Sequence, residues 1–291
     1  MGFSADTLQD RVAIVTGASQ GIGRAIAVEH ARVGAHVVVT SRRAEALEPV
    51  ATAVRAEGRR ALAVACDVGD ARQVDHAVVR TVETFGRIDI LVNNAGYRIR
   101  SPLEHLPRSE WDAMVATNLT GVFLFSQAVG RVMIRQRAGK IITVTSTAGR
   151  TGSRGMAAYA AAKAGAAVLM QSMGAEWAKY GILVNAVAPG PVETEGVLEV
   201  WKTPAMIAQA ARDVPLQRLG RPEEVAWAVV FVASDQASFM TGETLYVSGA
   251  PVWPTARTPN ESRVRHQPEP GHPAAPRKGH ARVHRPGEDG R

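Results

Sequence analysis

A short glycine-rich segment near the N-terminus constrains the fold of this chain more than any other feature. The apolar run at residues 12–15 leads directly into Thr16-Gly17-Ala18-Ser19-Gln20-Gly21-Ile22-Gly23, and we expect a helix at residues 22–33. Glycines permit a tight turn and a close approach to a phosphate, while a helix N-terminus offers free N–H groups and a positive dipole end. The spacing Gly-x3-Gly-x-Gly differs from the usual G-x-G-x-x-G fingerprint. Its place between a first strand and a first helix nevertheless predicts a diphosphate-binding loop, with an ordinary turn as the alternative.

The rest of the chain alternates between apolar runs and helical segments. Further strands are expected at residues 37–39, 61–64, 88–92, 141–144, 183–187 and 244–247, and a second helix at residues 44–57. Alternation of this kind implies a parallel sheet with helices on both faces. The predicted fold is therefore α/β, a Rossmann-type, doubly wound, parallel seven-stranded sheet.

The composition changes near residue 254 of the 291-residue chain. Residues 254–291 hold seven Pro, four His and eight Lys/Arg against four Asp/Glu, with almost no apolar periodicity. Such a segment cannot bury enough surface to offset its ordering entropy. We expect one domain at residues 1–253 and a disordered, basic, Pro-rich tail at residues 254–291.

Charge and cysteine usage limit the class of protein. The formal net charge is +7, of which the tail carries more than half, so the body gives no case for nucleic-acid binding. Cys66 is the only cysteine, which rules out an intrachain disulfide and fits a reducing compartment; we expect it to be an inert buried thiol. The N-terminus does not resemble a signal peptide, and no apolar run suggests a membrane span. We expect a cytoplasmic protein without a metal site or a membrane partner.

The end of the second expected strand indicates which dinucleotide is bound. The sequence there is Val39-Thr40-Ser41-Arg42-Arg43, without a carboxylate that could accept the ribose 2′-OH of NAD. A guanidinium suits a 2′-phosphate because its donors form a planar fork. We therefore predict NADP(H), with Arg42 as the main contact and Ser41 assisting; a solvated turn with stray charge is the alternative.

Tyr159 and Lys163 are four residues apart in the alanine-rich stretch Tyr159-Ala160-Ala161-Ala162-Lys163-Ala164. On a helix they share a face, and a neighbouring ammonium lowers the pKa of a phenol. Tyr159 would then suit proton transfer to a carbonyl oxygen as hydride arrives. Ser146 lies at the end of the expected strand at 141–144, where ligands bind in doubly wound sheets. A surface helix pair and a capping serine are the alternative interpretations.

Taken together, these motifs resemble the short-chain dehydrogenase/reductase family, and the match runs from about residue 9 to residue 249. The motif order is Thr16–Gly23, Asn93-Asn94-Ala95-Gly96, Asn118, Ser146, Tyr159, Lys163 and Pro189-Gly190. The resemblance implies a catalytic tetrad in which Tyr159 is the acid–base and Lys163 lowers its pKa and holds the nicotinamide ribose. Ser146 would orient the carbonyl, and Asn118 would hold a water in a proton relay.

The resemblance also implies the remaining cofactor contacts. Asp67 would lie near the adenine, Asn94 beside the cofactor, and Thr194 at the carboxamide. The full set of cofactor residues implied is Gly17, Ser19, Gln20, Gly21, Ile22, Gly23, Ser41, Arg42, Asp67, Val68, Asn94, Ala95, Gly96, Tyr159, Lys163, Pro189, Gly190, Val192 and Thr194.

Within the family, the chain is similar to the 3-oxoacyl-[acyl-carrier-protein] reductases, which implies an NADPH-dependent reduction of a 3-oxoacyl thioester on acyl carrier protein or coenzyme A. A general ketone, sugar or steroid dehydrogenase and a thioester-linked enoyl reductase are the alternatives. Arg131 and Arg135, four apart on an expected helix, are interpreted as a basic face beside the pocket, with solvated charge as the alternative. Tyr97, Arg98, Ile99 and Arg100 are expected to edge the pocket.

Two further expectations concern the substrate side and the assembly. Residues 195–215, with Trp201 and Met206, resemble the family's substrate lid, although an ordinary helix pair is the alternative. The resemblance implies a homotetramer or homodimer. The last strand is followed by Ser248-Gly249-Ala250 where the family commonly has Asp-Gly-Gly, and this departure weakens the expectation for the subunit interface.

Overall fold

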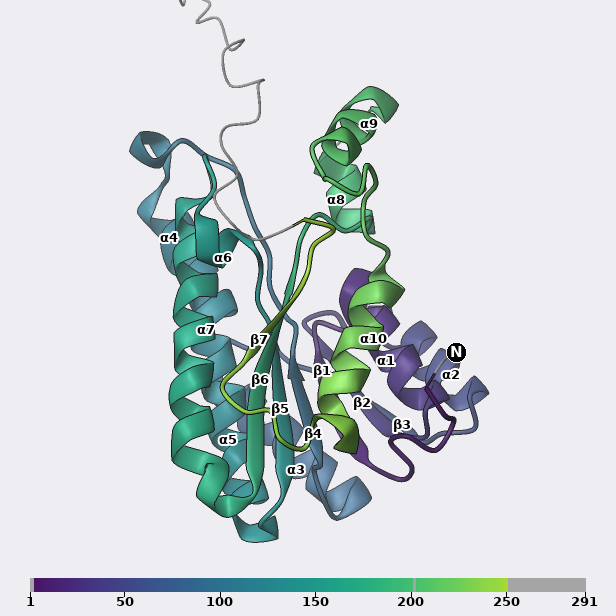
Figure 1. The fold of residues 1–291 in the computed structure, drawn as a ribbon. Helices are drawn as coiled ribbons and strands as arrows, with labels where there is room; N and C mark the ends of the chain where they lie inside the picture. The colour runs from purple at the N-terminus through teal and green to yellow at the C-terminus, as the bar shows by residue number, and fades with distance from the viewer. Residues whose placement is uncertain (1–2, 201–202, 251–291) are drawn as a thin grey trace, which may run out of the picture. The chain divides into compact units, whose positions relative to one another are not determined.

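The sheet is the centre of the molecule (Figure 1). In a computed structural model, residues 3–200 and 203–250 are described, and they contain a seven-stranded sheet in which every neighbouring pair is parallel. The strands are β1 Val12–Thr16, β2 His36–Ser41, β3 Ala61–Ala65, β4 Ile90–Asn93, β5 Gly139–Val144, β6 Ile182–Pro189 and β7 Thr244–Val247. The predicted fold class is confirmed. The expected tail at residues 254–291 lies outside the described residues.

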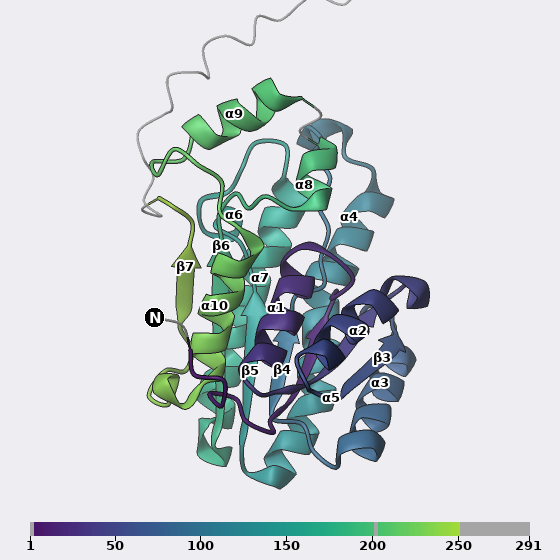
Figure 2. The ribbon, with the colours of Figure 1, turned by 90° about the vertical axis from the view of Figure 1, so that its right-hand side faces the viewer.

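Helices cover both faces of the sheet, as Figures 1 and 2 show. They are α1 Gly21–Arg32, α2 Glu48–Ala56, α3 Ala71–Phe85, α4 Arg108–Val115, α5 Gly121–Gln136, α6 Ala148–Thr151, α7 Ala157–Trp177, α8 Glu195–Val200, α9 Pro204–Arg212 and α10 Pro222–Ala233. Short 3-10 turns lie at Ala44–Ala46, Leu103–His105, Ala178–Tyr180 and Asp235–Ala237, and a π-helical turn at Ala116–Thr120 joins α4 to α5. Helices α1, α2 and α10 pack on one face, and α3, α5 and α7 on the other.

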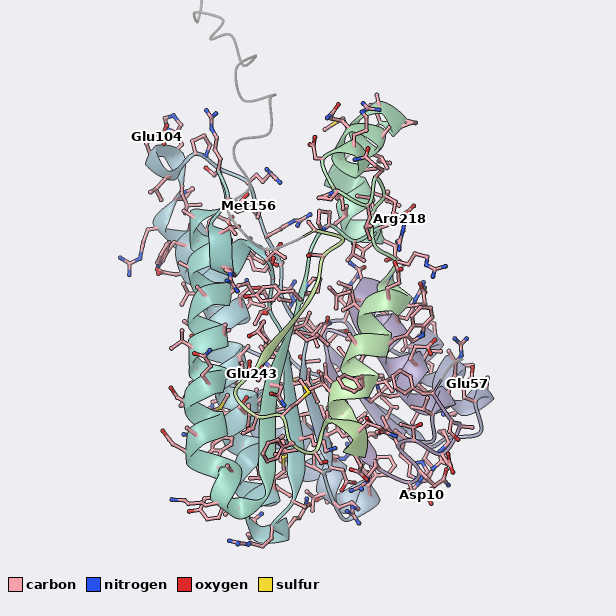
Figure 3. All side chains as sticks on the ribbon, viewed as in Figure 1. Asp10, Glu57, Glu104, Met156, Arg218 and Glu243 are labelled. Carbon is pink, nitrogen blue, oxygen red and sulfur yellow. The ribbon has the colours of Figure 1, made fainter. Side chains whose placement is uncertain are left out.

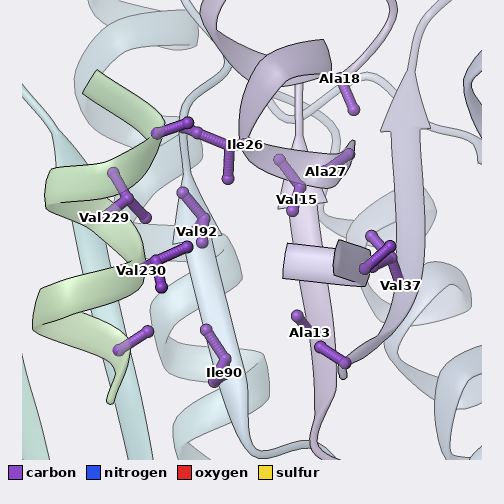
Figure 4. Packing of buried hydrophobic residues seen from close by; sticks show 14 of the residues in the cluster. Ala13, Val15, Ala18, Ile26, Ala27, Val37, Ile90, Val92, Val229 and Val230 are labelled. Atoms are coloured by element: carbon purple, nitrogen blue, oxygen red, sulfur yellow. The ribbon is translucent and has the colours of Figure 1, made fainter. Parts of the chain in front are cut away.

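Two apolar clusters, one on each face, hold the layers together. Side chains alternate between the faces of a strand, so Ala13 and Val15 of β1 join the cluster under α1 and α10, whereas Ile14 joins the other cluster. Figure 4 shows Val229 and Val230 of α10 packed in the first cluster. Burial on both faces explains why these strands are continuous apolar runs in the sequence.

The strand order β3-β2-β1-β4-β5-β6-β7 locates the site. The chain moves outward from β1 to β3, returns to β4, and then moves outward in the other direction. In such sheets, ligands bind at the carboxyl ends of the strands where the direction reverses. In Figure 3, Asp10 lies just before β1 at the lower end, and Met156 and Arg218 lie at the upper end, so the upper edge is the carboxyl edge.

The helical run 108–136 bears on the expectation that no segment spans a membrane. By length and composition it is the one helix among the described residues that could do so. In this structure, Phe125, Val129 and Met133 are buried against the sheet. We therefore interpret this run as a core helix of the α/β domain.

Candidate active site

The glycine-rich loop between β1 and α1 has the close packing that its sequence predicts. Gly17 and Gly21 have φ values of 63° and 55°, in the left-handed region that favours glycine. A Cβ on Gly23 would lie 2.3 Å from the Gly17 carbonyl oxygen, so a side chain is excluded there. The Asn94 side-chain amide donates to the carbonyls of Thr16 at 2.9 Å and Gly17 at 3.1 Å. The loop is thus fixed to the end of β4.

Thr16 completes this junction, a role the sequence did not reveal. Its Oγ1 accepts hydrogen bonds from the backbone N–H groups of Asn94 and Ala95, both at 3.0 Å. Thr16 is 1% exposed, so these contacts are sheltered from water. Asn94 and Ala95 therefore lie beside the glycine loop, as expected for residues next to the cofactor.

The ends of β2 and β3 form the side predicted to hold the adenosine. Ser41 ends β2 and pairs in register with Ala65 of β3, which places Asp67 and Val68 close by. Arg42 is exposed, and no ion pair to it occurs within residues 3–200 and 203–250. The Asp67 carboxylate accepts from the Gly69 N–H at 2.9 Å. An exposed, unpaired guanidinium at this edge fits the phosphate contact predicted for Arg42.

Ser146, Tyr159 and Lys163 come together at the carboxyl edge. Ser146 follows β5 and lies close enough to the Tyr159 hydroxyl, which α7 carries near its start, to lower the pKa of that phenol. Four residues on, Lys163 is 4% exposed, and its Nζ donates to the Val144 carbonyl at 2.8 Å and lies 5.8 Å from the centre of the Tyr159 ring. The backbone acceptor Val144 has no signal in the sequence, because any residue supplies a carbonyl.

Burial dominates the electrostatics of Tyr159 and Lys163. It raises the pKa of the Tyr159 phenol above its usual value, while the neighbouring Ser146 side chain and the Arg98 charge lower it in part. Burial also lowers the pKa of Lys163 to about 8. Desolvation of the phenol thus outweighs the effect of nearby positive charge in the chain alone, and the role expected of Lys163 stays a prediction.

Asn118 lies in the π-helical turn between α4 and α5 and is fully buried. Its Nδ2 donates to the carbonyls of Tyr97 at 2.9 Å and Met114 at 3.0 Å, whereas its buried Oδ1 has no protein partner. A Cβ on Gly96 would lie 2.6 Å from that Oδ1 and 3.3 Å from Lys163 Nζ. Asn118 Oδ1 is thus a buried acceptor near the Lys163 ammonium, next to a space that a side chain at Gly96 would fill. This arrangement fits the water that the resemblance assigns to Asn118.

The end of β6 forms the side predicted to hold the nicotinamide. The carbonyl of Pro189 accepts from the Thr147 N–H at 3.0 Å, and a Cβ on Gly190 would lie 2.8 Å from Ser248 Cα. Beyond them, Val192 is buried and Thr194 Oγ1 accepts from the Val197 N–H at 3.3 Å. These four residues therefore follow one another from the sheet edge towards the lid.

The unusual ending Ser248-Gly249-Ala250 still continues the sheet edge. The Gly190 N–H donates to the carbonyl of Val247 at 3.0 Å, and the Leu216 N–H donates to the carbonyl of Gly249 at 3.2 Å. The ending thus ties β7 to β6 and to the segment that follows the lid.

The lid prediction and the docking prediction have different outcomes. Within the stretch 195–215, α8 and α9 lie beyond the carboxyl edge and Met206 is exposed, whereas Trp201 is outside the described residues; the lid role stays a prediction. Arg131 and Arg135 are exposed on α5, but near its C-terminal end, where the Gln136 amide bonds the Ile88 backbone before β4. Within one chain they lie at the opposite edge from Asn118, so the expected placement beside the pocket is wrong.

The comparisons with known proteins agree with this geometry. A family profile described as enoyl-(acyl carrier protein) reductase matches residues 17–249. The chain belongs to the short-chain dehydrogenase/reductase family. It is 41% identical to a 3-oxoacyl-[acyl-carrier-protein] reductase of Synechocystis, over 84% of this chain and 98% of the relative. It is also 41% identical to the corresponding Escherichia coli reductase, over 83% and 97%.

A solved structure gives the same result for the fold. A protein of Beutenbergia cavernae, described as an NAD(P)-dependent gluconate 5-dehydrogenase with bound NADP, superposes with a TM-score of 0.80 at 35% identity. The superposition covers 84% of this chain and 98% of that one. The chain is therefore an oxidoreductase whose relatives include 3-oxoacyl reductases and whose structural neighbours include a sugar-acid dehydrogenase.

Proposed function

We propose that this protein is an NADPH-dependent carbonyl reductase that converts a 3-oxoacyl thioester to the 3-hydroxy product. The observation that carries the proposal is the Tyr159 hydroxyl, which lies close enough to Ser146 for that side chain to lower its pKa and stands beside the buried Lys163. A phenol held in this way at the carboxyl edge suits proton transfer to a carbonyl oxygen.

The residues would divide the chemistry as follows. Bound NADPH supplies the hydride to the carbonyl carbon. The Tyr159 hydroxyl donates its proton to the carbonyl oxygen, and the Ser146 hydroxyl donates a second hydrogen bond that orients it. Lys163 favours the phenolate that Tyr159 leaves behind. A water on Asn118 Oδ1 would carry a proton from solvent back through Lys163 to Tyr159.

Three features support a dinucleotide. The first turn of α1 contains no acidic residue, and the Gln20 side chain does not cap it. Its Gly21 N–H binds an anionic oxygen, that of the Glu195 carboxylate, so this helix end suits an oxyanion. A side chain on Gly17 or Gly23 of the loop would clash, because its Cβ would lie 2.7 Å from Ala95 Cα or 2.3 Å from the Gly17 carbonyl oxygen. The exposed, unpaired Arg42 guanidinium supports NADP over NAD.

The cofactor assignment is tested with Arg42→Ala. Wild-type enzyme should prefer NADPH over NADH by one to three orders of magnitude in kcat/KM, which corresponds to roughly 1.4–4 kcal/mol. The variant should lose most of this preference, while Arg43→Ala, the matched control, should keep it. Equal specificity constants for both cofactors in the wild type would contradict the assignment.

The thioester is supported by the two 3-oxoacyl reductases of about 40% identity. A second candidate, a substrate with its own carboxylate such as a sugar acid, is favoured by Arg98, which is half-buried and close enough to Tyr159 to affect its pKa. The thioester-linked enoyl reductase is less well supported, because the Tyr159–Ser146 pair suits an oxygen that gains a proton.

Turnover with NADPH separates these candidates. Acetoacetyl thioesters of coenzyme A and of acyl carrier protein, a small free ketone, 5-ketogluconate and crotonyl-coenzyme A are compared at matched concentrations. Preferential reduction of the acetoacetyl thioesters is expected. Preference for the keto acid would favour the second candidate, and reduction of crotonyl-coenzyme A alone would favour the enoyl reductase.

We also propose that the enzyme works as a homotetramer or homodimer in the cytoplasm. The oligomer is supported by large apolar side chains left exposed on helices, such as Phe123 on α5, Val168 on α7 and Trp227 on α10. Multi-angle light scattering of the full chain tests the assembly.

A further inference from the structure

We propose that Glu195 is an internal competitor for the cofactor, because its carboxylate binds the same helix N-terminus that the cofactor diphosphate requires. Glu195 is the first residue of α8, 174 positions along the chain from Gly21. The inference rests on the proposed dinucleotide function and assigns to it a residue that sets cofactor affinity.

The contacts of Glu195 define the interaction. Its Oε2 accepts a hydrogen bond from the backbone N–H of Gly21 at 3.1 Å. Its Oε1 lies 3.4 Å from Nη2 of Arg24, one turn further along α1. One carboxylate therefore binds a free helical N–H with one oxygen and a guanidinium with the other, as a phosphate oxygen pair would.

This position is the one that a diphosphate needs. Gly21 is the first residue of α1, and the Gln20 side chain leaves the N–H groups of the first turn uncapped. The Gly21 N–H cannot serve two acceptors well, and two anions placed there would repel each other. A diphosphate on the loop must therefore displace Glu195.

Displacement of Glu195 would also release the base of the lid. Glu195 begins α8, and the neighbouring Thr194 lies against the same glycine, since a Cβ on Gly21 would be 3.3 Å from the Thr194 Cβ. The bond from Glu195 to Gly21 thus holds the base of the lid on the glycine loop. Only molecules in which this contact is broken can bind the cofactor. The contact therefore multiplies the apparent Kd for the cofactor by the inverse of the fraction of such molecules.

Glu195→Gln tests the competition, because the amide keeps the shape and loses the charge. NADP+ should bind the variant about three- to tenfold more tightly than wild type, since a helix terminus and a surface ion pair each contribute modestly. Glu193→Gln is the matched control: it removes a charge from the same segment, and within residues 3–200 and 203–250 the Glu193 side chain forms no hydrogen bond or ion pair, although it lines the same hollow as Glu195. This control should leave the NADP+ affinity unchanged.

A second ligand locates the effect. Adenosine 2′-monophosphate would use the Arg42 side of the site and lacks the diphosphate, so its Kd should be the same for wild type and Glu195→Gln. Equal tightening for both ligands would point to a general charge effect and overturn the proposal. Weaker NADP+ binding by the variant would also overturn it, because Glu195 would then be a cofactor contact.

Amide exchange of Gly21, measured by NMR without ligand, distinguishes this inference from the proposed function. The Gly21 N–H should exchange more slowly in wild type than in Glu195→Gln, by about the same three- to tenfold factor. If NADP+ bound neither protein, the proposed function would fail, while the exchange rates would still decide whether the contact exists. Identical exchange rates would overturn the contact itself.

Discussion

Helix α7 packs along one face of the sheet, and the lid helix α9 lies beyond the carboxyl edge; the two helices differ in how they are held. Eight of the 21 residues of α7 are buried, among them Lys163 and Met170, whereas none of the nine residues of α9 is. Helix α7 is anchored along its length by the core, and α9 rests on few apolar contacts. The difference indicates that the residues of the chemistry are fixed in place, while the residues around the substrate are left free to adjust.

Tyr159→Phe is expected to have the largest effect, because it removes a proton donor from the anchored element without disturbing the packing. The rate of carbonyl reduction should fall at least about a hundredfold, within the 10²–10⁴ range typical of general acid catalysis. NADPH affinity, measured by fluorescence titration, should be nearly unchanged. Tyr180→Phe, after the far end of α7, is the control and should behave as wild type. Near-normal turnover of Tyr159→Phe would remove this residue from the mechanism.

Two methionines allow a direct comparison of the helices. Met170 on α7 is completely buried, whereas Met206 on α9 is 47% exposed. Met170→Ala should lower the free energy of unfolding by about 2–5 kcal/mol, because it leaves a cavity in the core. Met206→Ala should change it by less than about 0.5 kcal/mol. Urea denaturation of both variants checks this, and equal losses would contradict the contrast between the helices.

Arg98→Gln should have the smallest effect on activity. Arg98 lies in the segment after β4, outside both helices, and its charge acts on Tyr159 of α7. The Arg98 charge lowers the pKa of Tyr159 against the larger effect of burial. Its loss should raise that pKa, so in the alcohol-oxidation direction the acidic limb of kcat/KM should move to higher pH. A half-exposed charge contributes about 1 kcal/mol, so kcat/KM for alcohol oxidation at neutral pH should fall roughly fivefold. An unchanged pH profile would show that Arg98 does not act on Tyr159.

Most of the fold could be predicted from the sequence, because doubly buried strands must be apolar runs and the loop before α1 must be glycine-rich. The predicted limits of β7 agree with the structure, and those of β4 differ by one or two residues because a buried apolar run does not show where pairing begins. Tyr159, Lys163 and Ser146 were predicted from spacing, and the structure brings them together.

The site was less predictable where backbone or distant segments contribute. The carbonyls of Val144 and Tyr97 hold Lys163 and Asn118, and a carbonyl has no signature in a sequence. The position of Arg131 and Arg135 was wrong because helical spacing defines a shared face but not which end of the sheet the helix reaches. The contact of Glu195 with Gly21 spans 174 positions, so only the folded chain reveals it.

The π-helical turn at Ala116–Thr120 has a consequence for how this enzyme can change. A π-helical turn contains one residue more than an α-helical turn, so the positions after it are rotated relative to those before it. Removing a single residue from the turn would restore a continuous α-helix and rotate α4 against α5, carrying the Asn118 amide away from Tyr97 while α5 stayed on the sheet. A deletion here would therefore disable the site yet spare the fold.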